Sequence, residues 1–97
     1  MDLYEKLEQC CPTIETLFTS EQLKEFMNTP RSDLYLYHFT LGTWLRNNWL
    51  YSKASPLYRL FVDNGIEHHD VMSSIIIKYF YNYLLKKNTR DNTKTPR

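Results

Sequence analysis

The stretch from Asp70 to Lys87, DVMSSIIIKYFYNYLLKK, decides the fold because it is apolar on more than one side. At helical spacing, one wide face carries Met72, Ile75, Ile76, Tyr79, Phe80 and Tyr83. Ser74, Lys78, Asn82 and Lys86 recur every four residues as a polar stripe, and the remaining side is again apolar. We expect a helix over residues 70–87, capped by Asp70. It is either central in a bundle or half of an oligomer contact, with Tyr81 and Leu85 as the self-association face.

A second long helix is predicted over residues 30–48, because Thr29-Pro30 resembles an N-cap followed by proline at the first helical position. At 100° per residue its inward stripe is Leu34, His38, Leu41, Leu45 and Trp49. Gly42 lies within this helix, where glycine is about 1 kcal/mol less favourable than alanine. A close crossing by another backbone would explain that glycine, so we expect the two long helices to pack across Gly42 as the spine.

Local patterns place the shorter elements. Pro12 is expected to break an N-terminal helix, Thr19 to Gln22 matches a capping box, and a helix from Ser55-Pro56 is expected to stop at Gly65. No strand pattern survives, so the predicted fold is all-α, a compact bundle of four to five helices. Residues 1–87 form one helical domain, and residues 88–97, which contain no apolar side chain, form a disordered tail.

The composition excludes several classes of protein. The 97 residues are 42% apolar and 15% aromatic with two glycines and four prolines, which excludes collagen-like and wholly disordered chains. The formal charge of +1 provides no global attraction for nucleic acid. Residues 1–33 nevertheless hold seven acids against three bases, so the charge is unevenly distributed.

Motifs of common enzymes and of targeting segments are missing. The chain has no phosphate-binding glycine loop, no C-x-x-C, no H-E-x-x-H and no G-x-S-x-G. Cys10 and Cys11 are adjacent, which disfavours a disulfide between them, so we expect two reduced thiols that pack. The segment Met1 to Leu7 lacks the features of a secretory signal, and no apolar run approaches a membrane span. We expect a cytoplasmic protein without membrane contact.

Two short motifs carry a family resemblance. Gly42 to Asn47, GTWLRN, fits G-x-x-[IL]-R-N, and Asp70 to Ser73, DVMS, fits D-x-[MA]-S. Over residues 32–86 the chain resembles a bacterial family of small domains of unknown function. The resemblance implies a compact, mostly helical domain and no activity, and the first 31 residues lie outside it.

Arg46 and Asp70 form the first candidate site. A charged group at the edge of an apolar stripe is unfavourable unless it is paired. Arg46 is therefore expected to reach Asp70 or helix-end carbonyls and to pin the third helix to the last one. The alternative is an anion or carboxylate receptor, because a guanidinium binds such groups through two parallel hydrogen bonds.

The second candidate is a docking surface of Tyr37, Trp44 and Asn47, which share a face away from the inward stripe. Exposed Trp and Tyr side chains are typical anchors of protein interfaces. The alternative is that the N-terminal helices fold over this face and bury Trp44.

The histidines do not indicate a metal site. His38, His68, His69 and Asp70 have poor spacing for a common ion, since adjacent side chains diverge. We predict no metal, no cofactor and no catalytic residue.

The favoured function is a non-enzymatic protein-binding module of bacterial or phage origin that docks on a protein partner and inhibits or neutralises it, with a homodimer left open. One alternative is a single-stranded nucleic-acid binder that uses Lys86, Lys87, Arg90 and Lys94. A second alternative is a small ligand-binding or enzymatic domain centred on Arg46.

Overall fold

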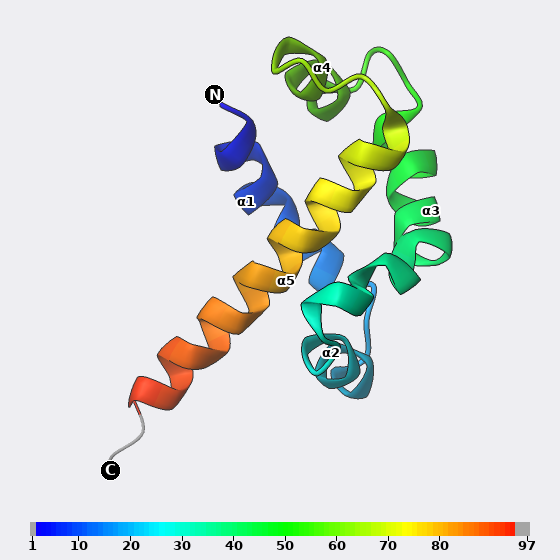
Figure 1. Cartoon of the computed structure of the whole chain (residues 1–97). Coiled ribbons are helices and arrows are strands. Elements are labelled where there is room, and N and C mark those ends of the chain that lie inside the picture. Colours follow the sequence, from blue (N-terminus) through cyan, green and yellow to red (C-terminus); the bar gives the residue numbers. More distant parts are fainter. Residues whose placement is uncertain (1, 95–97) are drawn as a thin grey trace.

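One long helix, α5, runs through the middle of the molecule, and the other elements pack around it (Figure 1). The computed structural model describes the backbone of residues 2–94 and the side chains of residues 2–88. The elements are α1 (Leu3–Glu15), α2 (Ser20–Met27), the 3₁₀ helix η1 (Arg31–Phe39), α3 (Leu41–Leu45), the π-helix η2 (Arg46–Leu50), α4 (Pro56–Asp63) and α5 (His69–Lys94). The described residues contain no strand, so the all-α prediction is confirmed, with more helical segments than the four to five expected.

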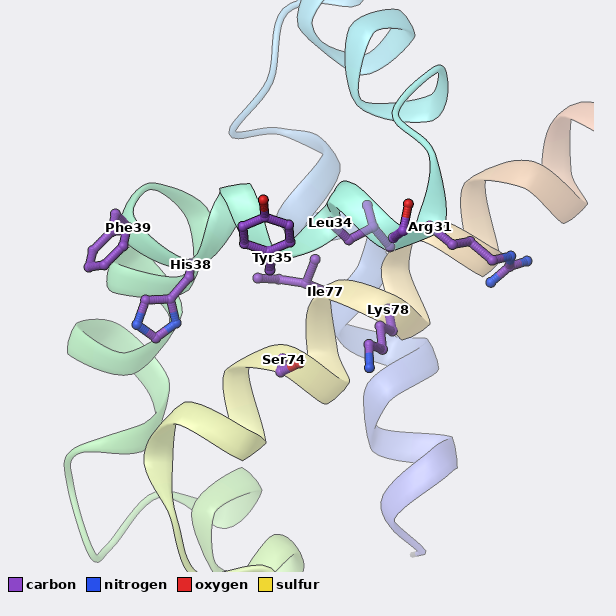
Figure 2. A pocket seen from close by; sticks show the side chains of 9 residues that line it. Arg31, Leu34, Tyr35, His38, Phe39, Ser74, Ile77 and Lys78 are labelled. Carbon is purple, nitrogen blue, oxygen red and sulfur yellow. The ribbon is translucent and has the colours of Figure 1, made fainter.

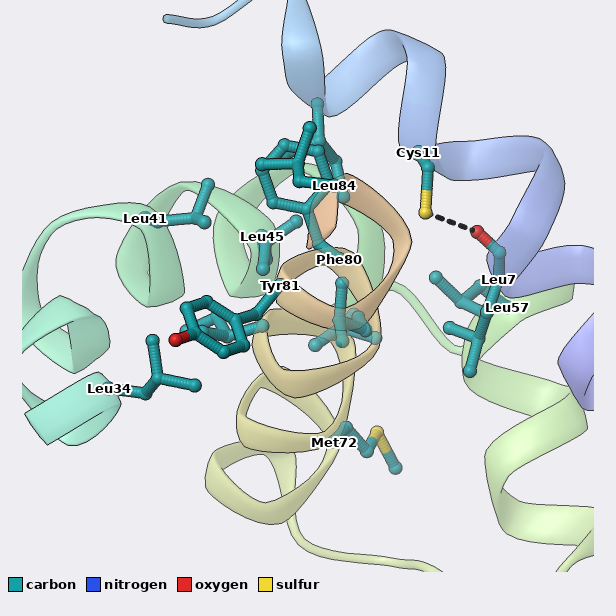
Figure 3. Close-up of a cluster of buried hydrophobic side chains, with 14 of the residues drawn as sticks. Leu7, Cys11, Leu34, Leu41, Leu45, Leu57, Met72, Phe80, Tyr81 and Leu84 are labelled. Atoms are coloured by element: carbon teal, nitrogen blue, oxygen red, sulfur yellow. Dashed lines mark hydrogen bonds between the residues drawn. The ribbon is translucent and has the colours of Figure 1, made fainter. Parts of the chain in front are cut away.

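The central position of α5 follows from its apolar surface. Met72, Ile76 and Phe80 are fully buried along one side, and Ile77 and Tyr81 are buried on another. Helix α5 contacts α1, α2, η1, α3 and η2, so neighbours cover both sides. Figure 3 shows Leu34 and Leu41 on one side of α5 and Leu7 and Cys11 on the opposite side.

The N-terminal helix α1 continues through Pro12, so the predicted break at this proline is wrong. Pro12 is exposed, whereas Leu7, Cys11 and Ile14 are buried against the core. A helical path through residues 11–14 is needed to bury Ile14, and that burial outweighs the hydrogen bond that proline removes. At the start of α1, Asp2 and Glu5 form a capping box that the sequence analysis did not identify.

The predicted helix over residues 30–48 is divided into three segments, which corrects the expected spine. Thr40 leaves helical geometry with φ −112° and ψ −88°, and this residue separates η1 from α3. In a 3₁₀ helix, side chains three residues apart lie above one another. Leu34 and Tyr37 therefore both point inward, where Leu34 is buried and the Tyr37 ring lies 4.8 Å from that of Phe26. This tertiary contact selects the tighter winding over residues 31–39.

Two of the predicted helix ends form as expected, and two do not. The Thr19–Gln22 capping box forms with both of its hydrogen bonds, and Gly65 takes the left-handed conformation with φ 81° after α4. Thr29 does not cap η1, because its hydroxyl donates to the Glu25 carbonyl instead. Asp70 lies inside the first turn of α5 rather than at its cap position.

The far end of α5 extends beyond the predicted boundary at Lys87. The backbone is helical to Lys94, within the segment expected to be a disordered tail, and residues 95–97 lie outside the described part of the chain. Within residues 2–94, no helix combines the length and the apolar character that crossing a bilayer requires.

Candidate functional site

Arg46 is a buried cation at the junction of α3, η2 and α5, with only 6% of its surface exposed. Its Nη1 donates to the Ser73 hydroxyl at 3.0 Å, and its Nη2 donates to the His38 carbonyl at 3.1 Å and to the Thr43 hydroxyl at 3.2 Å. Nε lies 3.8 Å from Asp70 Oδ1. The guanidinium is thus tied to η1, to its own helix and to the first turn of α5.

His38 completes the surroundings of the guanidinium. Its Nδ1 lies 3.4 Å from Arg46 Nη1. Because a guanidinium only donates, Nδ1 must accept in this contact, which leaves the proton of a neutral imidazole on Nε2. His38 therefore contacts Arg46 through both its ring and its backbone carbonyl.

Gly42 makes room for this arrangement. A Cβ atom at position 42 would lie 2.9 Å from Arg46 Nη1, closer than real contacts allow. The nearest backbone atom is the Tyr37 carbonyl oxygen in the same region of the chain, at 3.4 Å. The atoms nearest to this position do not belong to α5, so the expected crossing of the last helix at Gly42 is wrong, although α5 does contact η1, α3 and η2. The atoms that occupy the space next to Gly42 belong to the side chain of Arg46, one helical turn further along the chain.

The two sequence motifs meet at this junction. Gly42 and Arg46 come from the first motif, and Asp70 and Ser73 come from the second. The buried Ser73 hydroxyl accepts from Arg46 and donates to the Asp70 carbonyl at 3.1 Å. Asp70 itself contributes little energy, because its side chain is 74% exposed and exposed carboxylates are screened by water. Among the described residues, no buried side-chain polar atom lacks a hydrogen bond. Nη1 and Nη2 of Arg46 thus form their hydrogen bonds within the chain, which favours a structural anchor over an anion receptor.

The predicted docking residues Tyr37, Trp44 and Asn47 do not form one surface. Tyr37 and Trp44 are half-buried and line a pocket of about 410 Å³ against α2 and the α1–α2 connection. The Trp44 ring packs edge-on against Trp49, with centroids 5.2 Å apart. Asn47 is exposed in η2 and does not line that pocket. The N-terminal helices therefore cover this face in part.

Tyr81 is not available as a self-association residue, which corrects the prediction for this position. It is buried inside the monomer, and its hydroxyl donates to the Thr29 carbonyl at 2.7 Å. Leu85 is half-buried and packs against the core of the same chain. The second apolar side of α5 is covered by η1 and α2, since residues distant in sequence fold back onto it.

Three exposed apolar side chains on η1 were missed. Tyr35, Leu36 and Phe39, called the η1 ridge below, are 70%, 58% and 82% exposed. The 100° spacing used for the prediction placed Tyr35 and Phe39 beside the inward stripe. A period of three residues turns Leu36 and Phe39 to the same outward side. A spacing of three over residues 31–39 places Leu34 and Tyr37 on one side of the helix and Leu36 and Phe39 on another. This spacing is the signal in the sequence that separates the inward residues from the exposed ones.

Neither the histidines nor the cysteines form a reactive centre in the described part of the chain. His69 packs on Tyr51 and Tyr58, and residues 2–88 contain no group of three side chains suited to a metal ion. Burial raises the pKa of Cys11 to about 12, and burial also raises the pKa of Cys10. Both cysteines are therefore thiols at neutral pH and not activated nucleophiles.

Of the four basic residues of the nucleic-acid alternative, Lys86 and Lys87 have described side chains. Lys87 Nζ lies 3.1 Å from Glu15 Oε2 and is paired with α1. Lys86 is exposed, and the side chains of Arg90 and Lys94 lie outside the described part of the structure.

A comparison with known families now places the chain. Residues 5–84 match the model of a domain of unknown function, DUF6794. The chain belongs to this family. The match begins within α1, so the DUF6794 domain includes N-terminal residues that the motif resemblance left out. Searches of curated proteins and of solved structures found no match to the chain.

Proposed function

We propose that this DUF6794 domain is a non-enzymatic protein-binding module that docks through the η1 ridge. The observation that carries the proposal is the exposure of three large apolar side chains within five residues, Tyr35, Leu36 and Phe39. Single exposed apolar residues are normal on protein surfaces, but contiguous apolar patches mark interaction sites. The ridge replaces Tyr37, Trp44 and Asn47 as the proposed docking surface, because its three side chains are more exposed and come from one short helix.

The interior of the fold supports a binding role over a catalytic one. The buried polar residue with the most contacts, Arg46, is occupied by partners from its own chain. The two thiols have raised pKa values because they are buried. The resemblance to bacterial domains supports a bacterial setting for the interaction, and inhibition of the partner stays a prediction.

Site-specific photo-crosslinking tests the proposal. A benzophenone amino acid replaces Phe39 in one variant and Tyr4 on α1 in a matched control, where the native ring is 67% exposed. Both variants are expressed in the organism that encodes the protein and irradiated. We expect a discrete, protease-sensitive adduct from position 39 that is absent from position 4.

Four results would overturn the proposal. The first three are no adduct from position 39, the same adduct from position 4, and an adduct that nuclease removes. The fourth is an adduct composed of two copies of this chain, which would show self-association in place of a foreign partner.

A further inference from the structure

A groove runs beside the η1 ridge, between η1 and α5, with a volume of about 470 Å³ (Figure 2). Its lining combines four apolar or aromatic side chains, two cations, His38 and two small hydroxyls: Arg31, Ser32, Leu34, Tyr35, His38, Phe39, Ser74, Ile77 and Lys78. The volume lies within the range of about 300–1,000 Å³ that is usual for binding pockets. The groove thus has the size and the mixed chemistry of a recognition site.

Apolar side chains line the middle of the groove and the end at Phe39. Leu34 and Ile77 are buried and contribute to its lining, while the rings of Tyr35 and Phe39 stand exposed beside them. In Figure 2, Phe39 and His38 lie at the end opposite Arg31 and Lys78. A side chain that entered between Tyr35 and Phe39 would remove both rings from water, which favours binding of an apolar group.

The other end of the groove is cationic and lacks its counter-charge. Arg31 and Lys78 are both exposed and both line the groove, and no carboxylate lines it. Within residues 2–88 neither cation has a carboxylate oxygen within 4.0 Å, because the ion pairs formed there join Arg46 to Asp70 and Lys87 to Glu15. The Arg31 guanidinium lies 5.2 Å from the centre of the Tyr81 ring, which orients it without neutralising it.

From this arrangement we infer that the groove binds an acidic peptide segment of the partner, in which a carboxylate side chain lies close to an aromatic or aliphatic one. The carboxylate pairs with Arg31 and Lys78, and the apolar side chain packs between Tyr35 and Phe39. This inference rests on the proposed function and names the chemistry of the partner. The partner is acidic because the groove supplies two cations and no anion.

A peptide fits these charges better than single-stranded nucleic acid does. Proteins that bind single strands follow the backbone with a continuous positive groove over several nucleotides. Here the positive charge is limited to one end of the groove, and the whole chain carries a formal charge of +1. Two cations suit one or two carboxylates and not a run of phosphates.

Peptide selection on the full chain tests the inference. A random peptide display library is selected on the immobilised protein, and one enriched peptide is synthesised and titrated by fluorescence anisotropy. We expect enriched sequences that combine Asp or Glu with Phe, Tyr, Trp or Leu. The R31E/K78E variant should bind the peptide roughly tenfold more weakly or worse, because two attractive contacts become repulsive.

The matched control is K53E/R59E, which makes the same change of charge at two exposed positions beside α4, away from the groove. It should bind the peptide as the natural protein does. Circular dichroism checks that both variants fold, and K78E alone serves if R31E/K78E does not. Enriched peptides without acidic residues, or equal binding of the peptide by both double variants, would overturn the inference. The proposed function would still stand in that case if position 39 gives its crosslinked adduct.

The same variants also test two other occupants of the groove, a nucleic acid and a second copy of this chain. A labelled oligothymidylate that bound the natural chain at physiological salt and not R31E/K78E would assign the groove to nucleic acid. A concentration-dependent dimer in sedimentation that R31E/K78E dissolved would assign it to a second copy. Either result would overturn the assignment of the groove to an acidic peptide segment. A natural chain that is monomeric and does not bind the oligonucleotide would support that assignment.

Discussion

The side chain of Arg46 is shielded from water, whereas the side chains of the η1 ridge are exposed to it. Arg46 is a charged side chain that is 6% exposed, and the ridge residue Phe39 is an apolar side chain that is 82% exposed. Each placement is unfavourable by itself, since charges prefer water and apolar rings avoid it. The chain compensates Arg46 with hydrogen bonds to His38, Thr43 and Ser73, whereas Phe39 packs edge-on against the His38 ring and is otherwise left in water.

This difference separates a structural feature from a functional one. A buried charge whose donors are occupied inside the chain is explained by the fold, and an exposed apolar patch is explained by what binds to it. Four experiments sharpen or break the comparison.

Of the changes at the two compared regions, Arg46→Ala is expected to have the largest effect. The substitution removes the hydrogen bonds that join Arg46 to Ser73 of α5 and to the His38 carbonyl of η1, and it leaves a cavity beside Ser73. We expect the free energy of unfolding to fall by about 2–3 kcal/mol, measured by urea denaturation. The control Arg59→Ala, at an exposed position on α4, should change it by less than about 0.5 kcal/mol. Equal losses in both variants would show that the junction has no special role.

A smaller loss is expected for Gly42→Ala. The new Cβ would meet Arg46 Nη1 at 2.9 Å and displace the guanidinium from Ser73. We expect a net loss of about 1–2 kcal/mol, although alanine gains about 1 kcal/mol of helix propensity over glycine. In an Arg46→Ala background the same change should be neutral or stabilising. A double-mutant cycle measures this coupling, and additive effects would contradict the proposed reason for the glycine.

The attachment of α1 to α5 is expected to weaken at high pH. The Tyr79 hydroxyl donates to Glu8 at 2.7 Å, and that hydrogen bond with burial raises the pKa of Tyr79 to about 12. Burial and a hydrogen bond to Glu15 raise the pKa of Tyr83 to about 12 as well.

Both pKa values lie above the ordinary value of about 10, so folding favours the neutral phenols. Their contribution is complete below pH of about 10 and is lost as the pH rises towards about 12. Urea midpoints measured across this range should fall less steeply for Y79F/Y83F than for the natural chain. Titration by tyrosinate absorbance should show late ionisation in the natural chain that is lost in Y79F/Y83F. Identical slopes in the two proteins would contradict the expectation.

The smallest effect on stability is expected at the η1 ridge. Phe39→Ser replaces a ring that is already in water, so the free energy of unfolding should change by less than about 0.5 kcal/mol. Phe26→Ala, at a fully buried ring of the core, is the matched contrast and should lower it by about 3–5 kcal/mol. A large loss from Phe39→Ser would show that the ridge stabilises the monomer and is not a docking surface.

Much of the local structure could be predicted, because it depends on neighbours in the chain. The capping box from Thr19 to Gln22 and the stop at Gly65 require only residues within one turn. The contact of Arg46 with Asp70 was also expected, since a charge beside an apolar stripe needs a partner. The position of Ser73 at the guanidinium was not, because it depends on how α5 is placed against η2.

The sequence by itself determined an all-α chain with an apolar last helix, because periodicity and capping are local properties that side-chain chemistry sets. Only the tertiary structure decided that residues 31–39 wind as a 3₁₀ helix. Leu34 and Tyr37 had to reach Phe26 and α5 together, and a period of three residues achieves this at the expense of exposing Tyr35, Leu36 and Phe39. The exposure of the proposed docking surface is thus a consequence of packing between distant segments, which no local pattern contains.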